Sequence, residues 1–216
     1  DHSNFRHDLI GRLRRTSQFI SGTTFGATED AHWLIEKVRR IHLQVEGTAP
    51  DGRPYAASDP HLLTWVHVAE VSSFLAAHLR YRNPRLSLAD QDAYYQEIAL
   101  IAERLGALDV PRSRREVEHY LHAMRPQLSC DARSQEVMGI LLDAPAPSRL
   151  AKPVGKLMLH AGIELLPQWA QQQLGLEPGH WQKRLIRLGV QGTAPVLRWA
   201  MRDGSAHRAR RRMGIE

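Results

Sequence analysis

The sequence has a single cysteine, Cys130, among its 216 residues. One thiol excludes an intrachain disulfide and a cage of cysteine ligands around a metal ion. Its neighbours, Ser129 and Asp131, supply no positive charge that would stabilise a thiolate. We therefore expect Cys130 to be a structural or surface thiol. The sparse use of cysteine is compatible with a reducing compartment.

Long apolar runs are also missing. No uninterrupted run approaches the roughly 20 residues that a membrane span needs, so we expect no transmembrane segment. No cleavable signal pattern opens the chain, which favours a cytoplasmic location. The chain begins with Asp1 instead of methionine, and we expect further residues upstream of it.

Motifs for several common chemistries are absent as well. The sequence has no glycine-rich phosphate loop and no Gly-x-Ser-x-Gly nucleophile elbow. No isolated pair of carboxylates stands in an apolar setting, as glycoside hydrolysis would require. These absences argue against phosphoryl transfer, serine hydrolysis and glycosidase activity.

The charge balance is positive, with 29 lysines and arginines against 23 acidic residues. The C-terminal segment holds a dense group of arginines, and no aromatic residue follows Trp199. A nucleic-acid surface would interleave basic and aromatic residues on one face, so we expect no nucleic-acid partner. Residues 203–216 are predicted to form a solvated or disordered basic tail.

What the sequence does contain is helical periodicity over almost its whole length, which predicts an all-α fold: a single globular helical bundle with a long central helix. We expect one domain over residues 1–216, with a possible subdomain edge near residue 145. The connector there contains Pro145, Pro147 and Pro153. The predicted helices cover residues 5–20, 28–45, 60–81, 87–106, 113–124, 133–142, 154–166, 178–188 and 194–201. Residues 21–26 are predicted to be a turn and residues 46–58 an irregular loop with the turn signal Pro50-Asp51-Gly52. Asp59 is expected to cap the helix that follows it, and Ser87 with Asp90 and Ser113 with Glu116 are spaced as capping boxes.

Two of the twelve histidines, His42 and His67, fall within the apolar pattern of long helices. A buried imidazole must satisfy two ring nitrogens away from water. On the pattern alone, a core histidine bonded to a neighbouring carbonyl or hydroxyl is the simpler interpretation. A haem offers another, because iron would satisfy one nitrogen and the porphyrin would supply an apolar wall.

Three further side chains, Arg39, Arg12 and Thr16, are spaced so that each shares a helix face with another candidate residue. Arg39 is one turn before His42 and could reach an acidic group beside it, such as a haem propionate, or could be an ordinary surface arginine. Arg12 and Thr16 are four residues apart and share a helix face. A guanidinium and a hydroxyl so placed could orient bound dioxygen by hydrogen bonding, although the pair alone is weak evidence.

Five ordered segments together resemble the DUF2236 family, the catalytic domain of mpaB-type oxygenases and rubber oxygenase. These segments are Asp1–Arg6, Gly11–Thr16, Val38–His42, Gly52–Tyr55 and Asp59–His67. The resemblance runs over nearly the whole chain, and residues 11–67 carry its specific part.

The resemblance implies a globin-related all-α fold and a b-type haem, with His42 as the proximal iron ligand. It places Arg12 and Thr16 on the distal side and Arg39 beside the ligand. Arg15 takes the position of a lysine that can approach iron, and His67 lines the pocket or has a structural role. The implied chemistry is dioxygen-dependent oxidation of a small apolar substrate, isoprenoid-like or lipid-like. The alternative is a helical protein that binds haem without turnover, or a haem-free binding protein.

Overall fold

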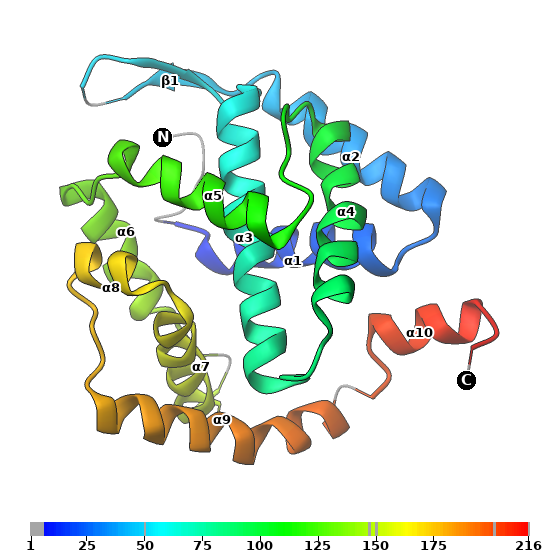
Figure 1. Cartoon of the computed structure of the whole chain (residues 1–216), viewed down its shortest axis with the longest axis vertical. Helices are drawn as coiled ribbons and strands as arrows, with labels where there is room; N and C mark the ends of the chain where they lie inside the picture. The colour runs from blue at the N-terminus through cyan, green and yellow to red at the C-terminus, as the bar shows by residue number, and fades with distance from the viewer. Residues whose placement is uncertain (1–6, 50, 147, 150, 201, 216) are drawn as a thin grey trace. The chain divides into compact units, whose positions relative to one another are not determined.

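The computed structural model describes residues 7–49, 51–146, 148, 149, 151–200 and 202–215. These residues form helices and one small two-stranded sheet, which confirms the predicted all-α class (Figure 1). The chain divides into two compact units, and each is described by itself. The first comprises Asp1–Leu75, Leu86–Ala123 and Asp203–Glu216, and the second comprises Ala76–Arg85 and Met124–Arg202. That these units behave as one domain stays a prediction.

The first unit contains α1 (Leu9–Phe25), α2 (Thr28–His42), β1 (Glu46–Thr48), β2 (Pro54–Ala56), α4 (Leu88–Leu105), α5 (Arg114–Met124) and α10 (Ser205–Arg212). Helix α3 (Pro60–Tyr81) contributes residues 60–75 to it. The second unit contains the end of α3, the 3-10 turn η1 (Arg125–Gln127), α6 (Ala132–Leu142), α7 (Lys152–Leu165), α8 (Gln168–Leu174) and α9 (His180–Ala200).

Helix α1 is longer at its end than the sequence predicted. Residues 21–25, expected to form a turn, are helical, and the hydroxyl of Thr23 donates to the carbonyl of Phe19 at 2.9 Å. A glycine inside this helix has a packing reason. A Cβ on Gly22 would lie 2.3 Å from a methyl carbon of Leu34 on α2, so only glycine lets the two helices approach this closely. The predicted start at Phe5 lies outside the described residues, and Asp8 caps the helix by accepting from the N–H of Gly11.

Helix α2 begins where the sequence predicted but ends before the expected residue 45. Thr28 is its first helical residue, and the helix has no side-chain cap because the N-cap residue is Ala27. The helix ends at His42 rather than near Val45, and the chain then turns into the hairpin of β1 and β2.

Residues 46–56 form an antiparallel hairpin rather than the irregular loop that the sequence predicted. Gly47 faces Tyr55 in its register, and the N–H of Ala49 donates to the carbonyl of Arg53 at 2.8 Å. Gly52 adopts a positive φ of 85° in the turn, a conformation that glycine takes without strain. Pro50, the other turn residue we singled out, lies outside the described residues. Strands of three residues are too short to be recognised in the sequence from an alternation of apolar and polar residues.

Helix α3 starts as predicted, since the carboxylate of Asp59 accepts the N–H of His61 at 2.8 Å. In the first unit it buries Thr64, Val68, Val71 and Leu75, which recur at helical spacing. A second buried cluster joins α4 to the segment after it: Ala99, Ala102, Ala107 and Val110, with Leu63 packed against it. The core of this unit therefore lies along α3 and α4.

The serine caps of both predicted capping boxes are confirmed, whereas the acidic side chains accept from other donors: Asp90 from the hydroxyl of Ser87, and Glu116 from the N–H of Arg112. Ser87 accepts the N–H of Asp90 at 3.0 Å before α4, and Ser113 accepts the N–H of Glu116 at 3.3 Å before α5. Each box satisfies N–H groups that the first turn of a helix leaves unpaired. Helix α4 ends at Gly106 in the left-handed conformation, as its glycine suggested.

In the described part of the chain, α3 alone is long and apolar enough to cross a membrane by length and composition, with a mean hydropathy of 1.3 over its most apolar window. Only 28% of that window is buried, although a buried core helix would pass the same test. The absence of a membrane span therefore stays a prediction.

Residues 205–212 form α10 on the first unit. Of the two forms expected for the basic tail, solvated or disordered, the second is therefore wrong for these residues. The hydroxyl of Ser21 donates to that of Ser205 at 2.7 Å, and Arg212 donates to the carbonyl of Phe25 at 2.9 Å. The latter contact supplies a donor at the C-terminal end of α1, where carbonyls lack partners within the helix. Glu216 lies outside the described residues.

In the second unit, α9 is one helix where the sequence predicted two. The predicted gap contains Gly189, where a Cβ would lie 3.0 Å from Leu157, so the glycine permits close packing of α9 on α7. The packed cluster is Ala161, Ile186 and Val190, with Tyr81, Leu157 and Met158 against it. Helix α8 was not predicted. Pro147 and Met201, named above for the connector and the last helix, lie outside the described residues.

Candidate functional site

His42 is the last residue of α2, and its ring is half-buried. Its Nδ1 atom is buried and has no hydrogen-bond partner among the described residues. Burial lowers the pKa of His42 below its ordinary value. The imidazole is therefore neutral at pH 7, which is the form that binds a metal ion.

Arg39, expected beside the ligand, is paired within its own helix. Its Nε donates to Glu36 at 2.8 Å, and Arg40 shares the same carboxylate at 3.1 Å. All three side chains are substantially exposed. For Arg39 to hold another carboxylate, it would have to exchange Glu36 for it, which an exposed ion pair permits at little cost.

Arg12, Arg15 and Thr16 lie on α1 and are exposed. Arg15 forms an ion pair with Asp8 at 3.2 Å. The close approach of Gly22 to Leu34 shows that α1 and α2 pack on each other near their connecting turn.

The structure places these residues on two consecutive helices of one unit. From the connecting turn, α2 rises along one side while α1 passes behind α3 (Figure 1). That Arg12 and Thr16 act on the same site as His42 stays a prediction.

His67 lies on α3, half-buried. Desolvation lowers its pKa to about 4, and the negative charge of Glu103 acts weakly in the opposite direction. Glu103 itself is paired with Arg112. His67 is thus a neutral histidine in an apolar setting, as the sequence pattern indicated.

The chain was compared with known families, curated proteins and solved structures. A family described as "ER-bound oxygenase mpaB/B'/Rubber oxygenase, catalytic domain" matches residues 1–214. The chain belongs to this family. No curated protein and no solved structure matches it. Membership confirms the resemblance stated above and supports an oxygenase-like function, and the predicted relation to the globin fold stays untested.

A family member with a metal held by side chains alone would need several ligands, and the described residues contain no group of three or more His, Cys, Asp or Glu side chains suited to one. A haem places a smaller demand on the protein, because the porphyrin supplies four nitrogens and one histidine suffices. The unpartnered Nδ1 and lowered pKa of His42 fit that role.

One carboxylate that the sequence analysis missed is Glu70, the only acidic residue in α3. It is half-buried, and burial raises its pKa above the ordinary value. It lies three residues after His67 and hence near the same helix face. Its charge also contributes to raising the pKa of Tyr94, whose hydroxyl donates to the carbonyl of Val71. A lone acid in an otherwise apolar helix was the available signal.

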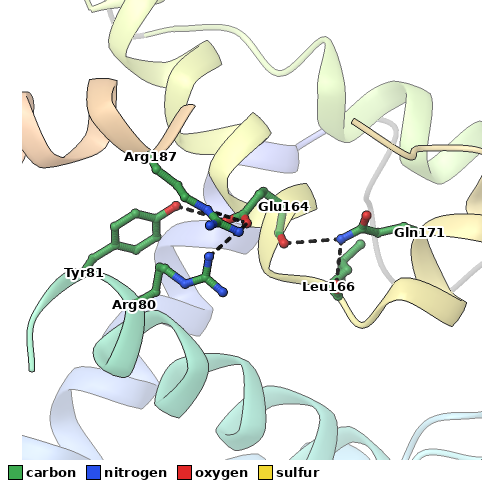
Figure 2. A network of polar contacts seen from close by, with 6 residues as sticks. All are labelled: Arg80, Tyr81, Glu164, Leu166, Gln171 and Arg187. Carbon is green, nitrogen blue, oxygen red and sulfur yellow. Dashed lines mark hydrogen bonds and ion pairs between the residues drawn. The ribbon is translucent and has the colours of Figure 1, made fainter. Parts of the chain in front are cut away.

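Another missed group is the carboxylate of Glu164 in the second unit. It is 2% exposed and accepts hydrogen bonds from Arg80 at 3.1 Å, from Arg187 and from the hydroxyl of Tyr81 at 3.4 Å (Figure 2). Gln171 donates its amide nitrogen to the carbonyls of Glu164 and Leu166 in the same network. The carboxylate is saturated by protein donors, which is typical of a structural ion pair.

Each unit also contains a hollow. In the first unit, a space of about 590 Å³ is lined by α5 and the segment before it, including Pro111, His119 and Tyr120. In the second, a space of about 540 Å³ lies between α7 and α9. Neither is lined by any of the predicted site residues, so these hollows do not extend the candidate site.

Proposed function

We propose that the protein is a haem b-dependent oxygenase that acts with dioxygen on a small apolar substrate, isoprenoid-like or lipid-like. The family supports the oxygenase class. The observation that carries the haem assignment is the buried, unpartnered Nδ1 of His42 at the end of α2. A buried polar atom without a partner is costly, and such atoms often mark a position that a ligand completes.

In this proposal His42 would hold the iron of the haem, and its other ring nitrogen would need a hydrogen-bond acceptor to fix the ring. Arg39 would exchange Glu36 for a carboxylate of the haem. Arg12 and Thr16 would donate hydrogen bonds to dioxygen, with Arg15 near them. His67 would contribute a neutral, apolar wall. When bound, haem supplies the activation of dioxygen, which side chains alone do not provide.

The alternative is a protein of the same fold that binds haem without turnover, or that binds no haem. The exposure of Arg12 and Thr16 favours this alternative, because catalytic hydrogen-bond donors act most strongly where water is excluded. The two versions predict different results in two separate measurements.

The first measurement is a titration of the purified chain with hemin, followed by its Soret band. We expect a stoichiometric band in the wild type and in His67→Ala, and its loss in His42→Ala. Circular dichroism of both variants shows whether they remain folded. A wild type that takes up no hemin, or a His42→Ala variant with an unchanged band, would reject the assignment.

The second measurement is oxygen consumption by the haem-loaded chain with isoprenoid and fatty-acyl substrates. Turnover that falls at least about tenfold in Arg12→Ala supports the oxygenase. A protein that carries haem but consumes no oxygen with any of these substrates would support the non-catalytic alternative.

A further inference from the structure

Helix α9 carries a stripe of exposed apolar side chains along one face, interrupted at Gly192. Trp181, Leu185, Leu188, Val196 and Trp199 follow one another at helical spacing and are between 56% and 76% exposed. Tryptophans stand at both ends of the stripe. Large apolar side chains are seldom gathered in one exposed row unless the row contacts a partner.

The stripe is separate from the face by which α9 packs on its own unit. Ile186 and Val190 lie on the opposite side of the helix and are buried against Ala161 and Leu157 of α7. A helix of a compact unit needs only one apolar face to join the core. The second apolar face of α9 therefore has no role in the packing that the second unit shows.

The charge around the stripe is of one sign. Between Pro178 and Arg202 the sequence contains no acidic residue. Arg184 lies over the ring of Trp181 at 5.9 Å, and Arg202 lies over that of Trp199 at 5.7 Å. Arg198 is exposed in the last turn of the helix. Basic groups thus accompany the apolar row from one end to the other.

The apolar surface continues beyond the helix at Leu185. This residue also lines the hollow of about 540 Å³ between α9 and α7, together with Leu159, Ile163 and Ile186. The polar lining of that hollow is mixed in charge, with Lys156 beside the carboxylates of Asp143 and Glu177, so the positive charge belongs to α9 itself. The apolar area therefore extends from α9 onto α7 without leaving the second unit.

We propose that α9 docks on an anionic lipid bilayer and lies in the plane of its interface. A helix with an apolar row, flanking arginines and terminal tryptophans has the composition of an interfacial anchor. Tryptophan rings prefer the headgroup level, and each arginine gains attraction to anionic lipid. A second copy of the chain fits the row less well, because it would bring arginines against arginines. The inference is independent of the haem assignment.

The test measures co-sedimentation of the full chain with vesicles. One set contains phosphatidylcholine alone, and the other contains about a third phosphatidylglycerol. We expect binding to the anionic vesicles only. The double variant Trp181→Ala/Trp199→Ala should lose at least about tenfold in affinity, because two large rings no longer enter the bilayer. Arg184→Gln/Arg198→Gln should also lose about tenfold or more.

The matched control is Trp33→Ala on α2. Trp33 is 60% exposed and has Lys37 over its ring at 4.9 Å. It therefore resembles Trp181 and Trp199 in exposure and in having a basic group over its ring, but it lies outside the stripe. It should bind vesicles like the wild type. Loss of affinity in Trp33→Ala equal to that of the double variant would overturn the proposal.

Quenching of wild-type tryptophan fluorescence by brominated acyl chains tests the same contact without any substitution. We expect quenching with anionic vesicles. Absence of vesicle binding by the wild type would overturn the proposal. Sedimentation velocity tests the other occupant. If the wild type forms a dimer, the double variant does not, and neither protein binds vesicles, the partner of the stripe is a second copy of the chain and the proposal is overturned.

Discussion

Glu164 and His42 present two ways in which this chain treats a buried polar atom. The carboxylate of Glu164 receives donors from Arg80, Arg187 and Tyr81 and is closed off from water. The Nδ1 of His42 is equally hidden from water but receives nothing from the described residues. The first group is completed by the protein itself, whereas the second is left incomplete.

The difference indicates which of the two residues contributes to the stability of the fold and which is available to bind a ligand. A saturated buried carboxylate stabilises the packing of α7 on its neighbours, and its loss would leave two arginines without a partner. An unsaturated imidazole contributes no hydrogen bond that a substitution could remove. Glu164 should therefore act on folding, and His42 on ligand binding.

The largest expected effect is that of Glu164→Ala. It removes the shared acceptor of Arg80 and Arg187, which are 38% and 43% exposed and so retain part of their hydration. We expect the free energy of unfolding to fall by about 3 to 4 kcal/mol, at the lower end of the range for broken buried ion pairs. Urea denaturation followed by circular dichroism measures it.

The matched control is Glu36→Ala. Glu36 also bridges two arginines, Arg39 and Arg40, but all three are exposed. Its removal should leave the urea midpoint unchanged, because exposed ion pairs contribute little. Equal losses in the two variants would show that the comparison between saturated and exposed carboxylates is mistaken.

The second effect is a pH dependence due to His67. Its pKa in the folded chain is about 4, below the ordinary value of 6.5. Between these values the unfolded chain binds a proton that the folded chain does not, so the free energy of unfolding falls as the pH falls from about 6.5 to 4. The loss contributed by this residue amounts to about 2 to 3 kcal/mol and levels off below pH 4.

Comparison of the wild type with His67→Leu isolates this contribution, because carboxylates that titrate in the same range are common to both proteins. The variant should show a shallower decline over that interval. Parallel profiles for the wild type and His67→Leu would contradict the assignment of a neutral, desolvated ring.

The sequence predicted the parts of the fold that depend on local chemistry. The caps at Asp59, Ser87 and Ser113 depend on a side chain and an N–H two or three residues away, and all three are confirmed. Two errors lie at the turn expected over residues 21–26 and at the gap expected between residues 188 and 194. Gly22 and Gly189 in these segments are points of close packing between helices, which only the tertiary structure reveals.

For the site, the sequence indicated which residues to consider but not their partners. Spacing placed His42 and His67 in apolar patterns, and both are half-buried with lowered pKa values. The pairing of Arg39 with Glu36 was open to prediction, because Glu36 stands three residues before Arg39, but the sequence analysis considered only a haem propionate or a surface position. The sequence could not reveal the network of Glu164, whose donors lie 84 and 23 residues away in the chain. The roles of Arg12, Thr16 and Arg15 remain predictions.

The smallest effect on folding is the most informative about the site. In the haem-free chain, His42→Leu removes an unpartnered nitrogen and keeps an apolar side chain, so the free energy of unfolding should stay constant or rise by up to about 1 kcal/mol. Gln171→Leu is the matched contrast, because Gln171 also has a buried, unpartnered oxygen but donates its amide nitrogen to two carbonyls. That variant should lose about 1 to 2 kcal/mol. Hemin should then raise the melting temperature of the wild type and of Gln171→Leu but not that of His42→Leu. A large loss in haem-free His42→Leu would mean that the imidazole already has a partner, and the contrast with Glu164 would no longer hold.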